Sequence, residues 1–206
     1  MNTENSNSDR GLWLAWFLAS LIGYGLGMLL GASVAYGLFD RATFDGTMGI
    51  TLGIVMGTIG GFAQWVVLQE RIAGAGWWIL ASALGFATVF SMGGTVRPNE
   101  NPAMIGIRMA IAFGLVAGVP QWIILRQKVT RAGWWVLANM LGLLVAEMGF
   151  PLSIAISAAT GNDNLSMLVV ALVFAAGYGA VTASALVLLL SQSGSSKVES
   201  LATPHG

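Results

Sequence analysis

The sequence predicts an all-α fold: a six-helix transmembrane bundle of three tandem helical hairpins around a pseudo-threefold axis. The first observation is composition, because the 206 residues are 56% hydrophobic and only 9% charged, which is typical of membrane proteins. The second is length, because six apolar stretches can each cross a membrane. The third is an internal repeat, which indicates that one helical unit was duplicated.

The repeat is clearest in a segment that returns 57 residues later. Gln64 and Trp65 recur as Gln121 and Trp122, and chance does not align such rare pairs in this way. Other matched pairs are Gly57 and Gly114, Gly61 and Gly118, Trp77 and Trp134, Trp78 and Trp135, and Gly85 and Gly142. Each copy is an apolar helix, a short basic turn and a second apolar helix.

Partial copies of this unit stand at both ends of the chain. Residues 16–23 match residues 78–85. Small residues of the last apolar stretch fall in register with Gly53, Gly57 and Gly61, namely Ala171, Ala175 and Gly179. We therefore expect hairpins at 12–69, 77–126 and 134–190 within one transmembrane domain, 11–190.

The expected helices follow from where charges and turn residues stand. Four stretches carry no charge, 11–39, 46–69, 72–96 and 164–196, and two more, 104–125 and 134–157, carry only Arg108 and Glu147. About 20 residues cross a hydrocarbon core of ~30 Å, so each stretch is long enough. The third helix should end near Val96, and bends are expected at Pro120 and Pro151. The polar tails, 1–10 and 191–206, are expected to be disordered.

Lysine and arginine are distributed unequally between the two ends of these helices. One side holds Arg10, Arg71, Arg126, Lys128, Arg131 and Lys197, and the other holds Arg41, Arg97 and Arg108. The positive-inside rule then predicts that both termini are cytoplasmic. All eight tryptophans would consequently lie at the cytoplasmic interface.

Glycines recur every four positions on several helices, as at Gly49, Gly53, Gly57 and Gly61. Helices in lipid pack through such small residues because little hydrophobic drive holds them together. Equivalent stripes predict that the second, fourth and sixth helices meet near the axis, with the first, third and fifth outside. Packing is one interpretation of the stripes, and a pore on the axis is the other.

Polar residues follow the stripes at a spacing of three: Gln64, Gln121 and Thr182. This spacing keeps them on the face of the stripe, at one depth near the cytoplasmic end. They are interpreted as an interhelical hydrogen-bond clasp, because buried amides need partners, or as a polar constriction at a pore mouth. A second equivalent set is Ser20, Ser82 and Asn139, of which Asn139 is the most costly to bury.

Two ionisable residues lie deep in the expected membrane spans. Glu147 stands 12 residues beyond Trp135, which is about 18 Å at 1.5 Å per residue. Arg108 stands 14 residues before Trp122, which is about 21 Å. Because these depths agree, we expect an ion pair between Glu147 and Arg108, with either a structural role or a role in proton or ion coupling.

Several function classes are excluded by what the chain lacks. It has no cysteine, which rules out disulfides and thiolate chemistry. It shows no metalloprotease, phosphate-loop or hydrolase motif, and its one histidine, His205, lies in the C-terminal tail. We therefore expect no enzyme, and no catalytic residue, metal or cofactor. A net charge of +0 gives no reason to expect nucleic acid.

The motifs from Gln64 to Gly85 and from Gln121 to Gly142 resemble those of small polytopic membrane proteins of bacteria. These motifs read Gln-Trp-x-x-Leu, a basic turn, and Gly-Trp-Trp-x-Leu-Ala-x-x-Leu-Gly, and they cover about half of the chain. The resemblance implies a bacterial cytoplasmic membrane, and it implies no activity, substrate or catalytic residue.

The function that these observations favour is a non-catalytic structural or interaction component of the membrane, such as a subunit of a larger assembly. The expected partners are the lipid bilayer and either other membrane protein subunits or further copies of the chain. The alternative is a small channel or ion-coupled transporter that uses Glu147 and Arg108. Binding of a lipid or pigment against the tryptophans is a third possibility.

Overall fold

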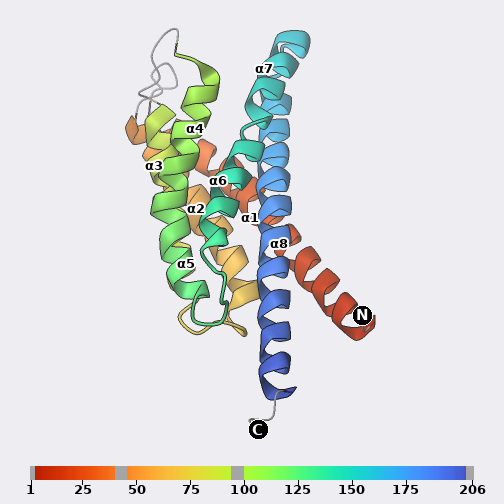
Figure 1. Cartoon of the computed structure of the whole chain (residues 1–206). Coiled ribbons are helices and arrows are strands. Elements are labelled where there is room, and N and C mark those ends of the chain that lie inside the picture. Colours follow the sequence, from red (N-terminus) through yellow and green to blue (C-terminus); the bar gives the residue numbers. More distant parts are fainter. Residues whose placement is uncertain (1–2, 40–45, 94–99, 203–206) are drawn as a thin grey trace.

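The chain is helical in the part that the structure describes (Figure 1). The structure is a computed structural model that describes residues 3–39, 46–93 and 100–202. For residues 3–6 and 193–202 it describes the backbone only. Its elements are α1 (Thr3–Leu38), α2 (Gly46–Leu68), α3 (Trp77–Gly93), α4 (Pro102–Phe113), the π-helix η1 (Gly114–Gly118), α5 (Val119–Leu125), α6 (Trp134–Ala146), α7 (Gly149–Thr160) and α8 (Asp163–Ala202). The prediction of an all-α fold is therefore confirmed.

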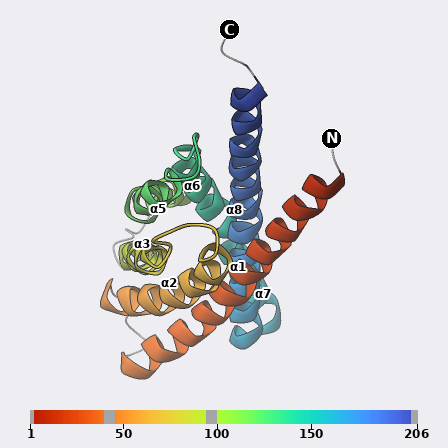
Figure 2. The same cartoon turned by 90° about the horizontal axis from the view of Figure 1, so that it is seen from below.

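The helices form a closed ring of six rods. The elements α4, η1 and α5 make one rod, and α6 and α7 make another. In chain order, α1 packs against α2, α2 against α3, α3 against the α4–α5 rod, and that rod against α6. Helix α8 packs against α6 and α7 on one side and against α1 on the other, which closes the ring (Figure 2).

Five of the rods are long and apolar enough to cross a membrane: residues 7–38, 46–68, 102–125, 134–160 and 163–192. The sixth, α3, has 17 residues in the described part, and its expected end near Val96 lies outside that part. Large apolar side chains face outward along these helices. On α1 they recur every four residues and are between 42% and 68% exposed, namely Leu14, Leu18, Ile22, Leu26, Leu30, Val34 and Leu38. Such a surface is what a multi-pass membrane protein presents to lipid.

Pro120 and Pro151 each follow an irregular stretch of helix. A proline has no N–H and its ring clashes with the carbonyl four residues earlier. For Pro120 that carbonyl belongs to Val116, which lies inside η1. For Pro151 it belongs to Glu147, at the break between α6 and α7. The expected distortions are therefore found one turn before each proline.

Helix extends from two of the membrane spans into the polar tails. Helix α1 already begins at Thr3, and α8 continues to Ala202. Extending an existing helix adds one hydrogen bond for each residue that is ordered, whereas starting a helix is costly. The polar residues at 3–10 and 191–202 therefore continue helices that the membrane spans have already nucleated.

The small-residue stripe of α2 packs against its neighbour in the chain and not on a central axis. A β carbon added at Gly57 would lie 2.5 Å from the Ser82 carbonyl oxygen, and Gly49 and Gly53 face the α3 backbone in the same way. On α1, Gly27 stands against the backbone of Met56. Among the described residues, α2, α5 and α8 do not pack side by side. The expectation that the second, fourth and sixth helices meet centrally was therefore wrong, because the glycines bring consecutive helices together.

Gly57→Ala tests this contact between α2 and α3. The added methyl group meets backbone atoms that cannot rotate away, so the free energy of unfolding should fall by about 1–3 kcal/mol. The measurement is reversible unfolding in mixed detergent micelles, followed by tryptophan fluorescence. Gly37→Ala is the matched control, because a β carbon at Gly37 meets no atom within 4 Å. Equal stability of the two variants would contradict the packing described here.

Candidate functional site: a buried polar layer and a carboxylate at a helix break

Six buried polar side chains form a layer across the bundle, and each comes from a different rod. They are Ser20 on α1, Gln64 on α2, Ser82 on α3, Gln121 on α5, Asn139 on α6 and Thr182 on α8, and all are 0% exposed. Apolar clusters lie on both sides of this layer. One includes Leu68 and Leu186, and the other includes Met28 and Phe174. The layer is therefore shielded within the protein and requires internal hydrogen bonds.

Three tryptophans fill the centre of the ring next to this layer. Trp16, Trp78 and Trp135 come from α1, α3 and α6, and each is 0% exposed. Their ring centroids are 5.7 Å apart for Trp16 and Trp78, 5.8 Å for Trp16 and Trp135, and 5.3 Å for Trp78 and Trp135. We call these three residues the tryptophan triad. At this level aromatic rings fill the centre of the bundle, where the sequence had predicted either closely packed helix backbones or a pore.

Each indole N–H of the triad donates a hydrogen bond to a polar residue that the sequence aligns. Trp78 donates to Gln64 Oε1 and Trp135 donates to Gln121 Oε1, both over 2.9 Å. Trp16 donates to Thr182 Oγ1 over 3.0 Å. The bond between Trp16 and Thr182 joins α1 to α8, and it therefore lies where the ring of helices closes.

A second group of hydrogen bonds joins the two helices within each expected hairpin. Gln64 Nε2 donates to Ser20 Oγ over 3.0 Å, and Gln121 Nε2 donates to Ser82 Oγ over 3.1 Å. In the third hairpin the donor is the Tyr178 hydroxyl, which lies 2.6 Å from Asn139 Oδ1. Every rod is therefore hydrogen-bonded to both of its neighbours in the ring.

The remaining polar atoms of the layer are also paired. The Tyr24 hydroxyl donates to Gln64 Oε1 over 3.0 Å. Asn139 Nδ2 donates to the Trp135 carbonyl over 3.0 Å, and the Thr182 hydroxyl donates to the Tyr178 carbonyl over 2.8 Å. The four predicted residues Gln64, Gln121, Asn139 and Thr182 thus form interhelical and local hydrogen bonds, and none of them faces an open lumen.

Sequence reasoning missed the inward orientation of the triad and the role of the two tyrosines. A signal was present, because each triad tryptophan stands four residues before a member of the Ser20, Ser82 and Asn139 set. Residues four apart lie on one helix face, so tryptophan and polar residue had to point the same way. Nothing comparable marks the two tyrosines, because Tyr24 aligns with Phe86 and Tyr178 aligns with Gly60, neither of which carries a hydroxyl.

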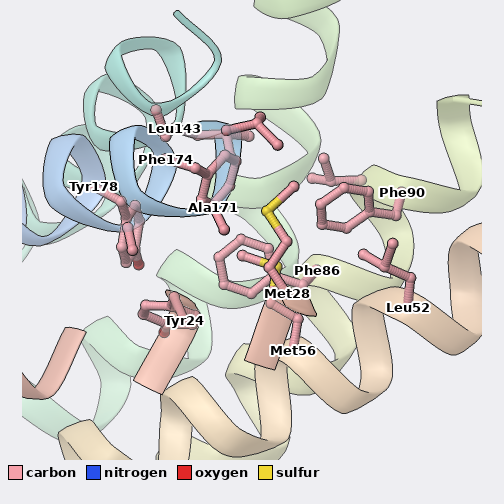
Figure 3. Packing of buried hydrophobic residues seen from close by; sticks show 14 of the residues in the cluster. Tyr24, Met28, Leu52, Met56, Phe86, Phe90, Leu143, Ala171, Phe174 and Tyr178 are labelled. Atoms are coloured by element: carbon pink, nitrogen blue, oxygen red, sulfur yellow. The ribbon is translucent and has the colours of Figure 1, made fainter. Parts of the chain in front are cut away.

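Aromatic and apolar side chains also fill the half of the bundle on the other side of the polar layer from the tryptophan triad, which we call the far half (Figure 3). The rings of Tyr24 and Tyr178 are 5.2 Å apart, and Phe86 lies 5.0 Å from Tyr24 and 5.9 Å from Tyr178. Figure 3 shows Met28, Met56 and Phe174 converging on the same space. Unbranched methionines fill irregular gaps between rings. The interior of this half is therefore packed with side chains from most of the ring.

Glu147 lies in this far half, at the break between α6 and α7. Its carboxylate faces α4, since a β carbon added at Gly106 would stand 2.6 Å from Glu147 Oε2. The other oxygen, Oε1, is buried and has no hydrogen-bond partner. The carboxylate therefore has unused capacity to accept a hydrogen bond or to carry a proton.

Arg108 binds Glu100 and not Glu147. The distance from Arg108 Nη1 to Glu100 Oε1 is 2.8 Å, while Nε and Nη2 of Arg108 are buried without a partner. The expected pair of Arg108 with Glu147 is therefore not formed in the described part of the chain. The reason is helical geometry: Glu147 contacts α4 at Gly106, and residues two apart do not share a helix face.

Three of the eight tryptophans lie in the interior of the bundle and do not face lipid. The triad is fully buried, whereas Trp77 and Trp134 are 67% and 63% exposed. Adjacent helix positions point about 100° apart, which separates the two members of each Trp-Trp motif. Within the described residues, no cluster of three histidine, aspartate or glutamate side chains could hold a metal ion.

A double-mutant cycle on Trp135 and Gln121 measures one bond of the layer. We expect Trp135→Phe and Gln121→Leu to be coupled by about 1 kcal/mol of unfolding free energy, the usual value for a hydrogen bond between transmembrane helices. The measurement is unfolding in mixed micelles of the wild type, both single variants and the double variant. A control cycle pairs Gln121→Leu with Trp134→Phe and should show no coupling. Equal coupling in both cycles would contradict the hydrogen bond.

Comparison with known proteins gives this chain no family. No protein-family model matches it, and neither the curated proteins nor the solved structures yielded a significant match. The resemblance to small polytopic bacterial proteins therefore stays a prediction, and function has to be argued from the geometry of the polar layer and of Glu147.

Proposed function

We propose that this protein is a non-catalytic structural or interaction component of a bacterial cytoplasmic membrane, built from three hairpins around a pseudo-threefold axis. One observation carries the proposal: the tryptophan triad occupies the centre of the ring and its N–H groups are all hydrogen-bonded. A side-chain layer that is fully buried and fully paired favours rigidity. Such rigidity is what a structural component or a docking partner needs, whereas a channel or transporter does not need it.

The surface at one end of the bundle supports an interaction role. The short turns 69–76 and 126–133 lie at the lower end in Figure 1, toward which both chain termini also point. The exposed rings of Trp77 and Trp134 begin the helices that follow these turns. Exposed tryptophans are common at membrane interfaces and in contacts between proteins. On this proposal the lower end is cytoplasmic and meets another subunit or another copy of the chain.

Co-purification tests the interaction role. The full-length protein, extracted in a mild detergent, should migrate as a complex larger than a monomer. Trp77→Ala and Trp134→Ala together should shift it toward the monomer by removing exposed aromatic area. Leu14→Ala with Leu18→Ala is the matched control, because these side chains are also about half exposed but lie along the α1 face. A wild-type protein that migrates as a lone monomer would contradict the proposal.

A second candidate function is coupling of a proton or ion by Glu147, and it rests on different atoms. Glu147 Oε1 and two nitrogens of Arg108 are buried without hydrogen-bond partners. An ionisable group inside a membrane span is costly and is retained mainly for function. The breaks before Pro120 and Pro151 also leave these rods less regular than α1 and α8. An ion-coupled transporter would use Glu147 as the titrating group.

Flux through proteoliposomes separates the two functions. If the protein is structural, Glu147→Gln and Arg108→Ala leave the proton and cation permeability of the vesicles at the level of protein-free vesicles. Both variants then act only on stability. If Glu147 couples an ion, the wild type shows flux above that level and Glu147→Gln reduces it at least tenfold, whereas Glu70→Gln in the exposed turn leaves it unchanged. Such a Glu147-dependent flux would overturn the structural proposal.

A further inference from the structure

A groove runs along the outer surface between α6 and α8 and has a volume of about 750 Å³. It is lined mostly by apolar and small side chains, among them Leu137, Leu141, Ala180, Ser184 and Leu188. On α8 the lining extends over residues 180–192, and steps of 1.5 Å per residue make this about 18 Å. That length covers one leaflet of a ~30 Å hydrocarbon core.

The groove is open because the third repeat carries small residues where the first carries large ones. In the register that aligns Gly61 with Gly179, Phe62 corresponds to Ala180 and Val66 corresponds to Ser184. Phe62 is 52% exposed and Val66 is 47% exposed on the outer face of α2. The same positions on α8 therefore lack the side chains that would fill the space beside α6.

One end of the groove is positively charged. Arg131 is the charged residue of its lining, and it lies in the turn 126–133 with Arg126 and Lys128 and without an acidic residue. Arg126 stands over the Trp122 ring at 5.7 Å. Arg131 is exposed and forms no salt bridge with any described residue. A guanidinium free to bind, beside an exposed tryptophan at the end of an apolar channel, matches the arrangement of a phosphate and an acyl chain in a lipid.

We propose that this groove is a binding site for one anionic phospholipid. One acyl chain lies along Leu137, Leu141 and Leu188, and the phosphate group binds Arg131. The small side chains Ala180 and Ser184 make room for the chain. A zwitterionic lipid presents the same acyl chains but a neutral headgroup, so Arg131, which lines the groove, gives the preference for negative charge. A basic residue near an anionic lipid surface contributes about 1 kcal/mol, or roughly fivefold in affinity.

The test uses quenching of Trp134 fluorescence by brominated lipids in vesicles of phosphatidylcholine. The signal of Trp134 is the difference between the full-length wild type and Trp134→Phe. We expect brominated phosphatidylglycerol to occupy the site about fivefold more readily than brominated phosphatidylcholine. Arg131→Gln should bring this ratio to one. Arg71→Gln, the arginine of the other short turn, is the matched control and should leave the ratio unchanged.

Two further variants separate the groove from a general surface effect. Ala180→Phe should fill the groove and reduce quenching by both lipids, and a reduction by neither would overturn the proposal. Equal quenching by the two lipids in the wild type would overturn it, and so would an equal loss of preference in Arg71→Gln and Arg131→Gln. Because the chain has no cysteine, Leu188→Cys reports on a second occupant. Disulfide-linked dimers through that position would show that another copy covers the groove, which would also overturn the proposal.

Discussion

The constraint on which this structure depends is that a polar group inside a membrane must find its partner within the protein. Water is not present there to accept an unpaired amide or indole N–H, and each unpaired group costs several kcal/mol. The six buried polar residues of the layer satisfy this constraint only when six helices stand in one order. Gln64 illustrates it, because its amide binds Ser20 on α1 and accepts from Trp78 on α3. The hydrogen bonds therefore specify the arrangement, while glycine packing supplies the close contact that the bonds require.

The layer and the glycine stripes act together along each pair of neighbouring helices. Gly57 lets the α2 backbone approach the carbonyl of Ser82 on α3, and Gln64 on the same helix α2 accepts a hydrogen bond from Trp78 on α3. Larger residues would hold the helices apart and leave amides unpaired. Away from the layer, the space is filled by rings and methionines, which tolerate irregular shapes. The fold thus combines one specific polar layer with less specific apolar packing on both sides.

Much of the architecture could be predicted from the sequence, and the exceptions have physical causes. The helical fold follows from long charge-free stretches, and the burial of Gln64 and Gln121 follows from their place beside the glycines. The distortions before Pro120 and Pro151 follow from the missing N–H. By contrast, which face of a glycine-rich helix meets which neighbour depends on three-dimensional packing, so the central position of the triad was not foreseen. The partner of Arg108 was also misassigned, because equal depth does not imply a shared face. The pseudo-threefold arrangement remains a proposal that the equivalent hydrogen bonds of the triad support.

The bond between Trp16 and Thr182 has a consequence for how the protein is made. The ribosome releases α1 before α8, so the indole N–H of Trp16 has no acceptor in the bilayer until α8 has been made. The other five rods can form their contacts with one another, but the ring stays open between α1 and the α6–α7 rod until α8 is inserted. A chain that lacks α8 therefore leaves the indole N–H of Trp16 unpaired and a gap between α1 and α6, and insertion of α8 closes both. Closure of the ring of helices thus depends on α8.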